Sequence, residues 1–262
     1  MKLGFWKMTG AGNDFVLLAG PVRDRAGWAR RLCDRREGVG ADGLLVLQLR
    51  AGRIRMTYNN ADGSAAFCGN GARCAAWWAF RQGWAGRDFV LATEPGELRA
   101  RIRGREQVEL GMPEPGPLRR ACRVRAGGRV FSVHYVDTGA PHAVVEVRGL
   151  DAFPVAEFGA QIRRARVFGP AGANVDFVSR CGRGLKLRTF ERGVEAETLA
   201  CGTGAVAAAL TAWQLGWTRP PVRIRVRSGD TLTVSFRTGP GAAREVRLSG
   251  PARIAFQGEV AL

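Results

Sequence analysis

The stretch CGNGARCAAWW at residues 68–78 returns as CGTGAVAAALT at residues 201–211, about half the chain length later. An alternating, strand-like pattern precedes each copy. Two shorter matches follow the same order and nearly the same offset: residues 9–11 with 138–140, and residues 40–42 with 172–174. Matches repeated at one offset indicate equivalent structural units. We therefore predict two pseudo-equivalent halves that join in the Pro/Gly-rich stretch 111–117.

Each copy begins with a cysteine, a C-G-x-G turn and then an Ala-rich, mostly apolar segment, at residues 72–80 and 205–213. Such segments favour buried central helices, and the glycines permit a tight turn in front of each. A helix N-terminus stabilises a thiolate, and its N–H groups bind carboxylates. We therefore predict that Cys68 and Cys201 are reactive, with inert packing as the alternative.

Two thiols on opposite faces of a carbon atom are suited to inverting it. One, as thiolate, removes the α-proton, and the other, as thiol, returns a proton to the opposite face. Hydrolysis or group transfer needs only one nucleophile. The pair therefore predicts an amino-acid epimerase, and the remaining cysteines are expected to be packing residues: Cys33, Cys74, Cys122 and Cys181.

The chain of 262 residues has the composition of a globular protein, with 46% hydrophobic and 24% charged residues. No apolar run is long enough for a membrane span, and the N-terminus lacks a signal-peptide pattern, so we expect a cytoplasmic enzyme. The net charge of +17 comes almost entirely from arginines that are scattered along the chain. A nucleic-acid binder clusters its cations, so we expect no nucleic-acid partner but an attraction for small anions.

Cofactor and metal patterns are missing. Pyridoxal chemistry needs a Schiff-base lysine, but the lysines lie at the terminus or in a strand pattern. The run Gly38–Gly43 matches G-x-G-x-x-G, yet it precedes an apolar run rather than opening a helix. His134 and His142 have no third ligand nearby, and the six cysteines do not form a disulfide framework. We predict no cofactor and no metal.

Eight blocks, in order, carry a resemblance to a known family: residues 7–15, 38–43, 60–64, 68–74, 138–142, 174–177, 191–193 and 197–204. Over essentially its whole length the chain resembles diaminopimelate epimerases. Asn70 separates it from proline-racemase-like relatives, which usually have histidine there. The resemblance implies conversion of LL-2,6-diaminopimelate to the meso form, which feeds lysine and cell-wall precursor synthesis. It also implies a homodimer.

The implied fold is α+β, with two pseudo-symmetric halves. Each half is a mixed β-sheet wrapped around a central apolar helix, and the active site lies in the cleft between them. Residues 1–113 form the N-terminal half, which carries Cys68 and is completed by a last strand at about 252–262. Residues 114–251 form the C-terminal half, which carries Cys201.

The implied site has Cys68 and Cys201 as proton donor and acceptor, with His142 and Glu191 as supporting polar groups. The substrate contacts would be Asn13, Asn60, Gly69, Asn70, Asn174, Glu191, Arg192, Gly202 and Thr203. Simpler roles remain open for several of these. The asparagines suit turns or caps, His142 suits a strand start, and Glu191 with Arg192 suits a surface pair.

Three positions depart from the family pattern. Ala140 and Gly43 stand where some members carry a polar side chain, asparagine or glutamine. The spacing from Asn60 to Cys68 is one residue short, which leaves Asn59 and Asn60 as alternatives for facing the ligand. Two other functions are considered: a racemase of another amino acid, such as histidine, and a non-catalytic binding protein on the same scaffold.

Overall fold

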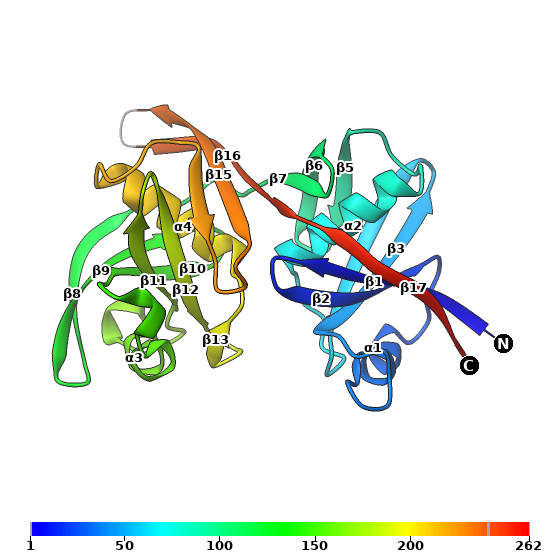
Figure 1. Ribbon diagram of the computed structural model, residues 1–262, viewed down its shortest axis with the longest axis horizontal. Coiled ribbons are helices and arrows are strands. Elements are labelled where there is room, and N and C mark those ends of the chain that lie inside the picture. The colour runs from blue at the N-terminus through cyan, green and yellow to red at the C-terminus, as the bar shows by residue number, and fades with distance from the viewer. Residues whose placement is uncertain (1, 240–241, 262) are drawn as a thin grey trace. The chain divides into compact units, whose positions relative to one another are not determined.

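The computed structural model describes residues 2–239 and 242–261, and the chain forms two compact units. Unit 1 consists of Met1–Gly111 with Ser249–Leu262, and unit 2 of Met112–Leu248. The sequence predicts divisions after residues 113 and 251, and the units divide after residues 111 and 248. Each unit is a sheet with two α-helices (Figure 1).

The sheet of unit 1 is mixed. Its strands pair in the order β17 (Arg253–Ala261), β1 (Lys2–Gly10), β2 (Asn13–Ala19), β3 (Gly43–Arg50), β4 (Arg53–Asn60), β5 (Asp88–Thr93), β6 (Gly96–Gly104) and β7 (Gln107–Gly111). The pairs β2–β3 and β4–β5 are parallel. Parallel neighbours need a crossover connection, and α1 (Arg25–Cys33) and α2 (Gly69–Arg81) provide the two crossovers.

Unit 2 repeats this order of strands and directions. Its strands pair in the order β8 (Arg119–Ala126), β9 (Arg129–Asp137), β10 (Pro141–Glu146), β11 (Asn174–Cys181), β12 (Gly184–Glu191), β14 (Val222–Arg225) and β15 (Thr231–Gly239). The parallel pairs are β10–β11 and β12–β14. Their crossovers contain α3 (Val155–Ile162) and α4 (Gly202–Gln214).

Three short elements and one long strand complete the chain. The short strand β13 (Ala196–Thr198) pairs with the end of β12, just before α4. The 3-10 helices η1 (Leu150–Ala152) and η2 (Arg166–Phe168) flank α3. The strand β16 (Ala242–Pro251) leads from unit 2 back into unit 1, where β17 follows.

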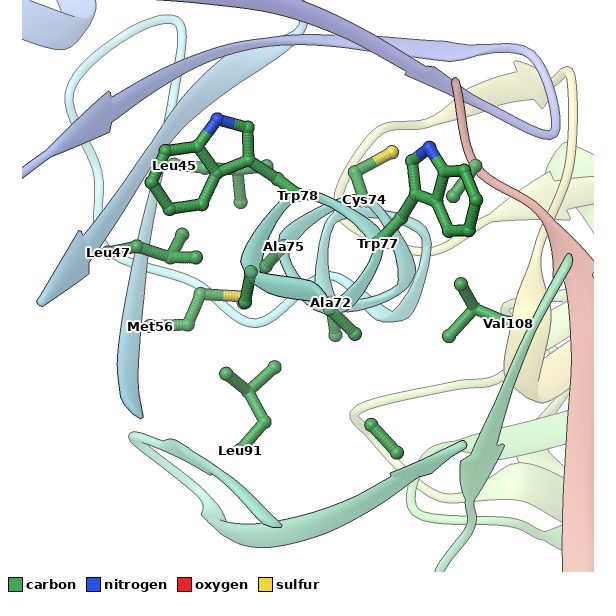
Figure 2. Close-up of a cluster of buried hydrophobic side chains, with 14 of the residues drawn as sticks. Leu45, Leu47, Met56, Ala72, Cys74, Ala75, Trp77, Trp78, Leu91 and Val108 are labelled. Carbon is green, nitrogen blue, oxygen red and sulfur yellow. The ribbon is translucent and has the colours of Figure 1, made fainter. Parts of the chain in front are cut away.

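The helix α2 is the core of unit 1, because it is apolar on nearly every side (Figure 2). Trp78 is 1% exposed, and its ring packs edge-on against Trp6 and Trp84 at centroid distances of 4.9 and 4.8 Å. Leu45 from β3 and Met56 from β4 pack against the alanines of the helix. The matching helix α4 is buried from Gly204 to Ala212.

The other helices cover the opposite sheet faces. In β2 and β3 alternate side chains point to opposite faces: Phe15 and Leu45 pack around α2, whereas Val16 and Leu44 pack around α1. In unit 2, α3 packs in the same way against Val175 and its neighbours. The predicted α+β fold of two similar halves is confirmed. Among the described residues, no helix is long and apolar enough to cross a membrane.

Candidate active site

Cys68 and Cys201 occupy the same structural position in their units. Each is the N-cap of its helix, with extended backbone at φ −134° and ψ 114° for Cys68 and φ −121° and ψ 118° for Cys201. Each sulfur accepts a hydrogen bond from the backbone N–H three residues on, at 3.4 Å, from Gly71 and from Gly204. The sequence repeat is therefore a repeat of thiol-capped helices, with Gly69 and Gly202 opening the first turns.

The surroundings of Cys201 are polar. His142 and Asp176 are both fully buried, and the His142 Nδ1 lies 2.6 Å from the Asp176 Oδ2. The other ring nitrogen, Nε2, lies 2.9 Å from the Thr203 Oγ1. That hydroxyl lies 3.5 Å from the Cys201 sulfur. These contacts form one continuous chain of polar groups behind the thiol.

The side chains that pack against the first-turn glycines differ between the units. A Cβ added to Gly71, in the first turn of α2, would lie 2.9 Å from the Leu45 Cδ2 and 3.5 Å from the Phe15 ring. A Cβ added to Gly204, in the first turn of α4, would lie 2.3 Å from the Asp176 Oδ1. The two helices thus share the geometry of the thiol cap, but the side chains that pack against their first turns are apolar in unit 1 and charged in unit 2.

Burial dominates the acidity of Cys201. The side chain is 8% exposed, and this burial, followed by the charges of Glu191 and Asp176, raises its pKa well above the ordinary value. Hydrogen bonds from Thr203 and the Gly204 N–H act in the opposite direction. The sequence predicts a lowered pKa at a helix start, and for Cys201 this is wrong in the resting structure because desolvation outweighs the helix end.

Glu191 lies at the end of β12 beside Cys201. Its carboxylate accepts a hydrogen bond from the Thr198 Oγ1 at 2.5 Å. Burial raises the pKa of Glu191, while hydrogen bonds from Thr198 and Cys201 and the nearby His142 partly offset the rise. A carboxyl held in this way can stay protonated to higher pH than a surface glutamate.

A second polar network lies in unit 1, around the predicted substrate asparagines. The Asn13 amide donates to the Asp42 carboxylate at 2.8 Å and accepts from the Asn70 amide at 2.6 Å. Arg73, on the next turn of α2, donates to the Asn70 Oδ1 at 2.5 Å. Arg35 donates to Asp42 from the other side at 2.7 Å. The network fixes both amides relative to the start of α2.

The two candidate asparagines at the end of β4 differ in exposure. Asn59 is 6% exposed, and its amide donates to the Gly63 carbonyl at 2.9 Å. Asn60 is half-buried, and its amide donates to the Ser64 hydroxyl at 3.0 Å. Of the two, Asn60 has the more accessible side chain.

Asn174 and Arg192 are tied to each other in unit 2. The Asn174 side chain is 7% exposed; it accepts from the Arg192 backbone N–H at 2.9 Å and donates to the Pro141 carbonyl at 3.2 Å. The Arg192 residue is exposed. Asn174 therefore shapes the loop that carries Arg192, whatever else it contacts.

The remaining cysteines include two that behave as core residues. Burial raises the pKa of both Cys33 and Cys74 to about 12, which keeps these thiols protonated and unreactive. Within residues 2–239 and 242–261, no group of three or more His, Cys, Asp or Glu side chains is arranged to hold a metal ion.

Sequence reasoning missed Asp176, Thr198 and Asp42. Asp176 carries a usable signal, because it is a charged residue between the apolar Val175 and Phe177 of a strand-like sequence. A charge in a buried strand has to be paired, and here its partner is His142. Asp42 and Thr198 lie inside the matching blocks 38–43 and 197–204, but nothing in those blocks assigns either side chain to the site.

Comparison with known proteins identifies relatives along almost the whole chain. A family model described as diaminopimelate epimerase matches residues 5–115 and 134–246. A diaminopimelate epimerase from Chlorobaculum tepidum is 41% identical over 97% of this chain and 100% of its own. Another from Aquifex aeolicus is 35% identical over 98% of this chain and 97% of its own.

Solved structures with little sequence identity share the fold. A phenazine biosynthesis protein of the PhzF family from Bacillus anthracis superposes with a TM-score of 0.74 at 14% identity, with both chains fully covered. A probable proline racemase from Agrobacterium radiobacter gives 0.69 at 18% identity, covering 99% of this chain and 93% of the other. From the family match and the relatives at 35% and 41% identity, the chain belongs to the diaminopimelate epimerase family.

Proposed function

We propose that the protein is an isomerase that converts LL-2,6-diaminopimelate to the meso form, with Cys68 and Cys201 exchanging the α-proton. The activity is the one named for its family and relatives. The observation that supports the roles of the cysteines is their shared geometry: each sulfur caps the N-terminus of a buried helix in its own unit. These relatives do not favour another substrate or a non-catalytic role.

The reaction is a pair of proton transfers at one carbon atom. A thiolate takes the α-proton and becomes a thiol, and the electron pair left behind is stabilised through the substrate carboxylate. The opposite thiol gives its proton to the other face and becomes the thiolate. The protonation states of Cys68 and Cys201 are therefore exchanged after each turnover, and the enzyme must restore them before the same direction runs again.

Binding groups for the substrate carboxylate follow from the same geometry. Backbone N–H groups in the first turns, at Gly69–Asn70 and Gly202–Thr203, suit an anion because helix N-termini carry partial positive charge. Arg192 supplies a cation for a carboxylate at the distal end. Asn13, Asn60 and Asn174 offer amide oxygens for ammonium groups. Glu191 and His142 act on the substrate through Cys201.

The test uses LL-diaminopimelate in deuterium oxide, with α-proton exchange followed by NMR. Wild-type protein should form the meso isomer and incorporate deuterium. Cys68→Ala and Cys201→Ala should each lose inversion by a large factor with a much smaller change in ligand affinity, the pattern of a lost transition-state interaction. Cys181→Ala is the matched control, because Cys181 is exposed, and it should be fully active. Near-normal epimerisation by Cys201→Ala would refute the mechanism.

The protein is further proposed to be a homodimer. One feature that supports association is β17, which pairs along one edge with β1 and carries Phe256 at 50% exposure. Strand edges with large apolar side chains favour pairing with another chain. Analytical ultracentrifugation should show a dimer, and Phe256→Lys should shift it toward monomer. A monomer at all concentrations in the wild type would contradict the proposal.

A further inference from the structure

We infer that the side-chain amides of Asn13 and Asn70 are each held in one orientation by the charges at the two ends of their hydrogen-bonded chain. The positioning residues are Asp42 at one end and Arg73 at the other. The inference rests on the proposed function, in which both asparagines contact the substrate. It deepens that function, because an amide donates at one end and accepts at the other. Its orientation therefore decides which charged group of the substrate it binds.

The order of donors and acceptors follows from the charged ends. A carboxylate only accepts hydrogen bonds, and a guanidinium only donates them. The Asn13 Nδ2 must therefore face the Asp42 carboxylate, from which it lies 2.8 Å. The Asn13 Oδ1 then accepts from the Asn70 Nδ2 at 2.6 Å. This leaves the Asn70 Oδ1 to accept from Arg73 at 2.5 Å. If either amide turned over, like groups would face each other on both of its sides.

The Asp42 carboxylate is itself fixed by three groups. Its Oδ2 accepts from the Asn13 amide and from the Asp14 backbone N–H, at 2.8 and 3.1 Å. Its Oδ1 accepts from the Arg35 Nη2 at 2.7 Å. Asp42 directly precedes β3, and Asn13 begins the parallel neighbour β2. The sheet therefore brings the two side chains to the same edge, and the carboxylate cannot turn away without breaking other hydrogen bonds.

Arg73 is a charged residue inside the central helix α2. It is 0% exposed, and burying a charge is costly unless it is hydrogen-bonded. Val206 occupies the matching position in α4, five residues after the cysteine, and is also 0% exposed. The valine shows that a central helix does not require a charge at this position. The bond from Arg73 to Asn70, one turn earlier in α2, gives the buried cation a polar role.

A fixed amide distinguishes between the charged groups of a substrate. Asn13 is half-buried, and its second amide hydrogen and second oxygen lone pair remain for a ligand. An amide that was free to turn over would exchange the places of donor and acceptor, and would bind ammonium and carboxylate groups about equally. Affinity falls with the fraction of molecules in the competent orientation. Asp42 and Arg73 thus contribute to binding through the two asparagines.

The first test is Asp42→Asn, which keeps the size of the side chain but gives it a donor end. Arg35 attracts the oxygen of the new amide, so its NH2 group faces the NH2 group of Asn13. This contact drives Asn13 toward the opposite orientation. KM for diaminopimelate should rise about tenfold, as for a lost hydrogen bond to a charged group. The turnover number kcat should stay within about twofold, because the amides bind the substrate without transferring its α-proton.

A second substitution should reverse this effect. In Arg35→Met/Asp42→Asn, no guanidinium attracts the oxygen of the new amide, which can then turn toward Asn13 and restore the original order. KM should return close to the wild-type value, although both members of the ion pair have been replaced. Asp88→Asn is the matched control, because Asp88 also accepts from arginines in unit 1, and its KM should be unchanged. A double variant no better than Asp42→Asn would overturn the inference.

Nuclear magnetic resonance reads the orientation directly, without substrate. Wild-type protein should show a scalar coupling across the hydrogen bond from the Asn70 side-chain nitrogen to the Asn13 Cγ. The coupling should be lost in Asp42→Asn, return in Arg35→Met/Asp42→Asn and persist in Asp88→Asn. Arg73→Met should weaken it, because the other end of the chain is then released. If Arg73→Met does not fold, the variants of Asp42 decide the question alone.

The outcomes separate the positioning role from the proposed substrate. If the coupling is lost and regained as expected but the protein does not act on diaminopimelate, the positioning role stands and the substrate assignment fails. If the protein epimerises diaminopimelate but Asp42→Asn keeps either the wild-type KM or the coupling, the function stands and the positioning role is overturned. A coupling in the reverse direction in wild type, from the Asn13 nitrogen to the Asn70 Cγ, also overturns it.

Discussion

Burial and the charge of Glu191 both raise the pKa of Cys201. Removing the charge of Glu191 shows how much of the rise is electrostatic. Its carboxylate raises that pKa because two negative charges repel when the thiol ionises. Glu191→Gln removes the charge and keeps a group that can hydrogen-bond Thr198. We expect the thiolate of Cys201 to form at lower pH. Ultraviolet titration of the thiolate, with Cys68 replaced by alanine, measures the change, and an unchanged or raised midpoint would contradict it.

Asp14 is the residue with the clearest link between ionisation and stability. Burial alone would raise its pKa, but hydrogen bonds from Arg35 and Lys7 lower it from 3.8 to about 2. Because the pKa is lower in the folded state, the ionised carboxylate stabilises the fold above about pH 4. The contribution, about 2 kcal/mol, should be lost as the pH falls from about 4 to 2.

Unfolding by denaturant at several pH values measures the contribution of the ionised Asp14 carboxylate to the free energy of unfolding. Asp14→Asn should lower the free energy of unfolding at neutral pH and flatten its dependence on pH in the acid range. The loss is expected to be about 3 kcal/mol, because Lys7 is 8% exposed and would be left as a buried charge without its partner. Asp151→Asn is the control: the Asp151 side chain is 79% exposed, and a small change is expected.

The candidate site was predictable from sequence where the signal was local. The cysteines stand out because each begins the same short motif, and Asn70 and Thr203 lie within those motifs. Asp176 was missed because its role depends on β10, β11 and α4 meeting, and these elements are far apart in the chain. The raised pKa of Cys201 was missed for a related reason, since burial is a property of the packed unit.

At the scale of elements, the first turns of α2 and α4 differ in their tolerance of a side chain. Gly71→Ala adds a Cβ against the Leu45 methyl group, the end of a flexible side chain. The gain in helix propensity, about 1 kcal/mol, should offset this contact and leave stability nearly unchanged. Gly204→Ala adds a Cβ against the fixed Asp176 carboxylate. We expect it to lower stability by about 1–3 kcal/mol, the usual range for overpacking.

Activity should separate the two alanine variants further. Displacing Asp176 disturbs its bond to His142, so Gly204→Ala should slow turnover by at least tenfold, whereas Gly71→Ala should stay within about twofold of wild type. Thermal unfolding and the diaminopimelate assay on both variants make the comparison. If Gly71→Ala and Gly204→Ala change stability and turnover equally, Asp176 can move without affecting either, and the expectation is wrong.

The central helices were predictable because their apolar character is visible in a single window of sequence. Helix α2 covers Gly69–Arg81 and α4 covers Gly202–Gln214, around the predicted segments 72–80 and 205–213. Helices α1 and α3 were not singled out, because each is short and its apolar face is set by the sheet beneath. The family resemblance alone predicted that β17 belongs to unit 1. The residues of β17 show no clean alternation of buried and exposed positions.

For the whole molecule, we expect activity without any added metal or organic cofactor. The chain lacks a lysine suited to a Schiff base and a spacing suited to metal ligands. Two thiols and two helix N-termini already supply the proton transfers and the anion binding. Dialysis against EDTA should leave kcat unchanged, and purified protein should show no visible absorbance. Loss of activity that zinc restores would contradict this expectation.

The division of unit 1 between the two ends of the chain has a consequence for protein synthesis. Residues 2–9 of β1 pair with β17, which the ribosome makes only after all of unit 2. Unit 2 is one continuous segment and can complete its sheet as soon as it emerges, so it should fold first, although N-terminal domains usually do so. Nascent chains stalled with residues 1–248 outside the ribosome should protect unit 2 from protease and leave unit 1 open to cleavage. Until β17 emerges from the ribosome, β1 therefore has an unpaired edge, the kind of surface that chaperones protect from aggregation.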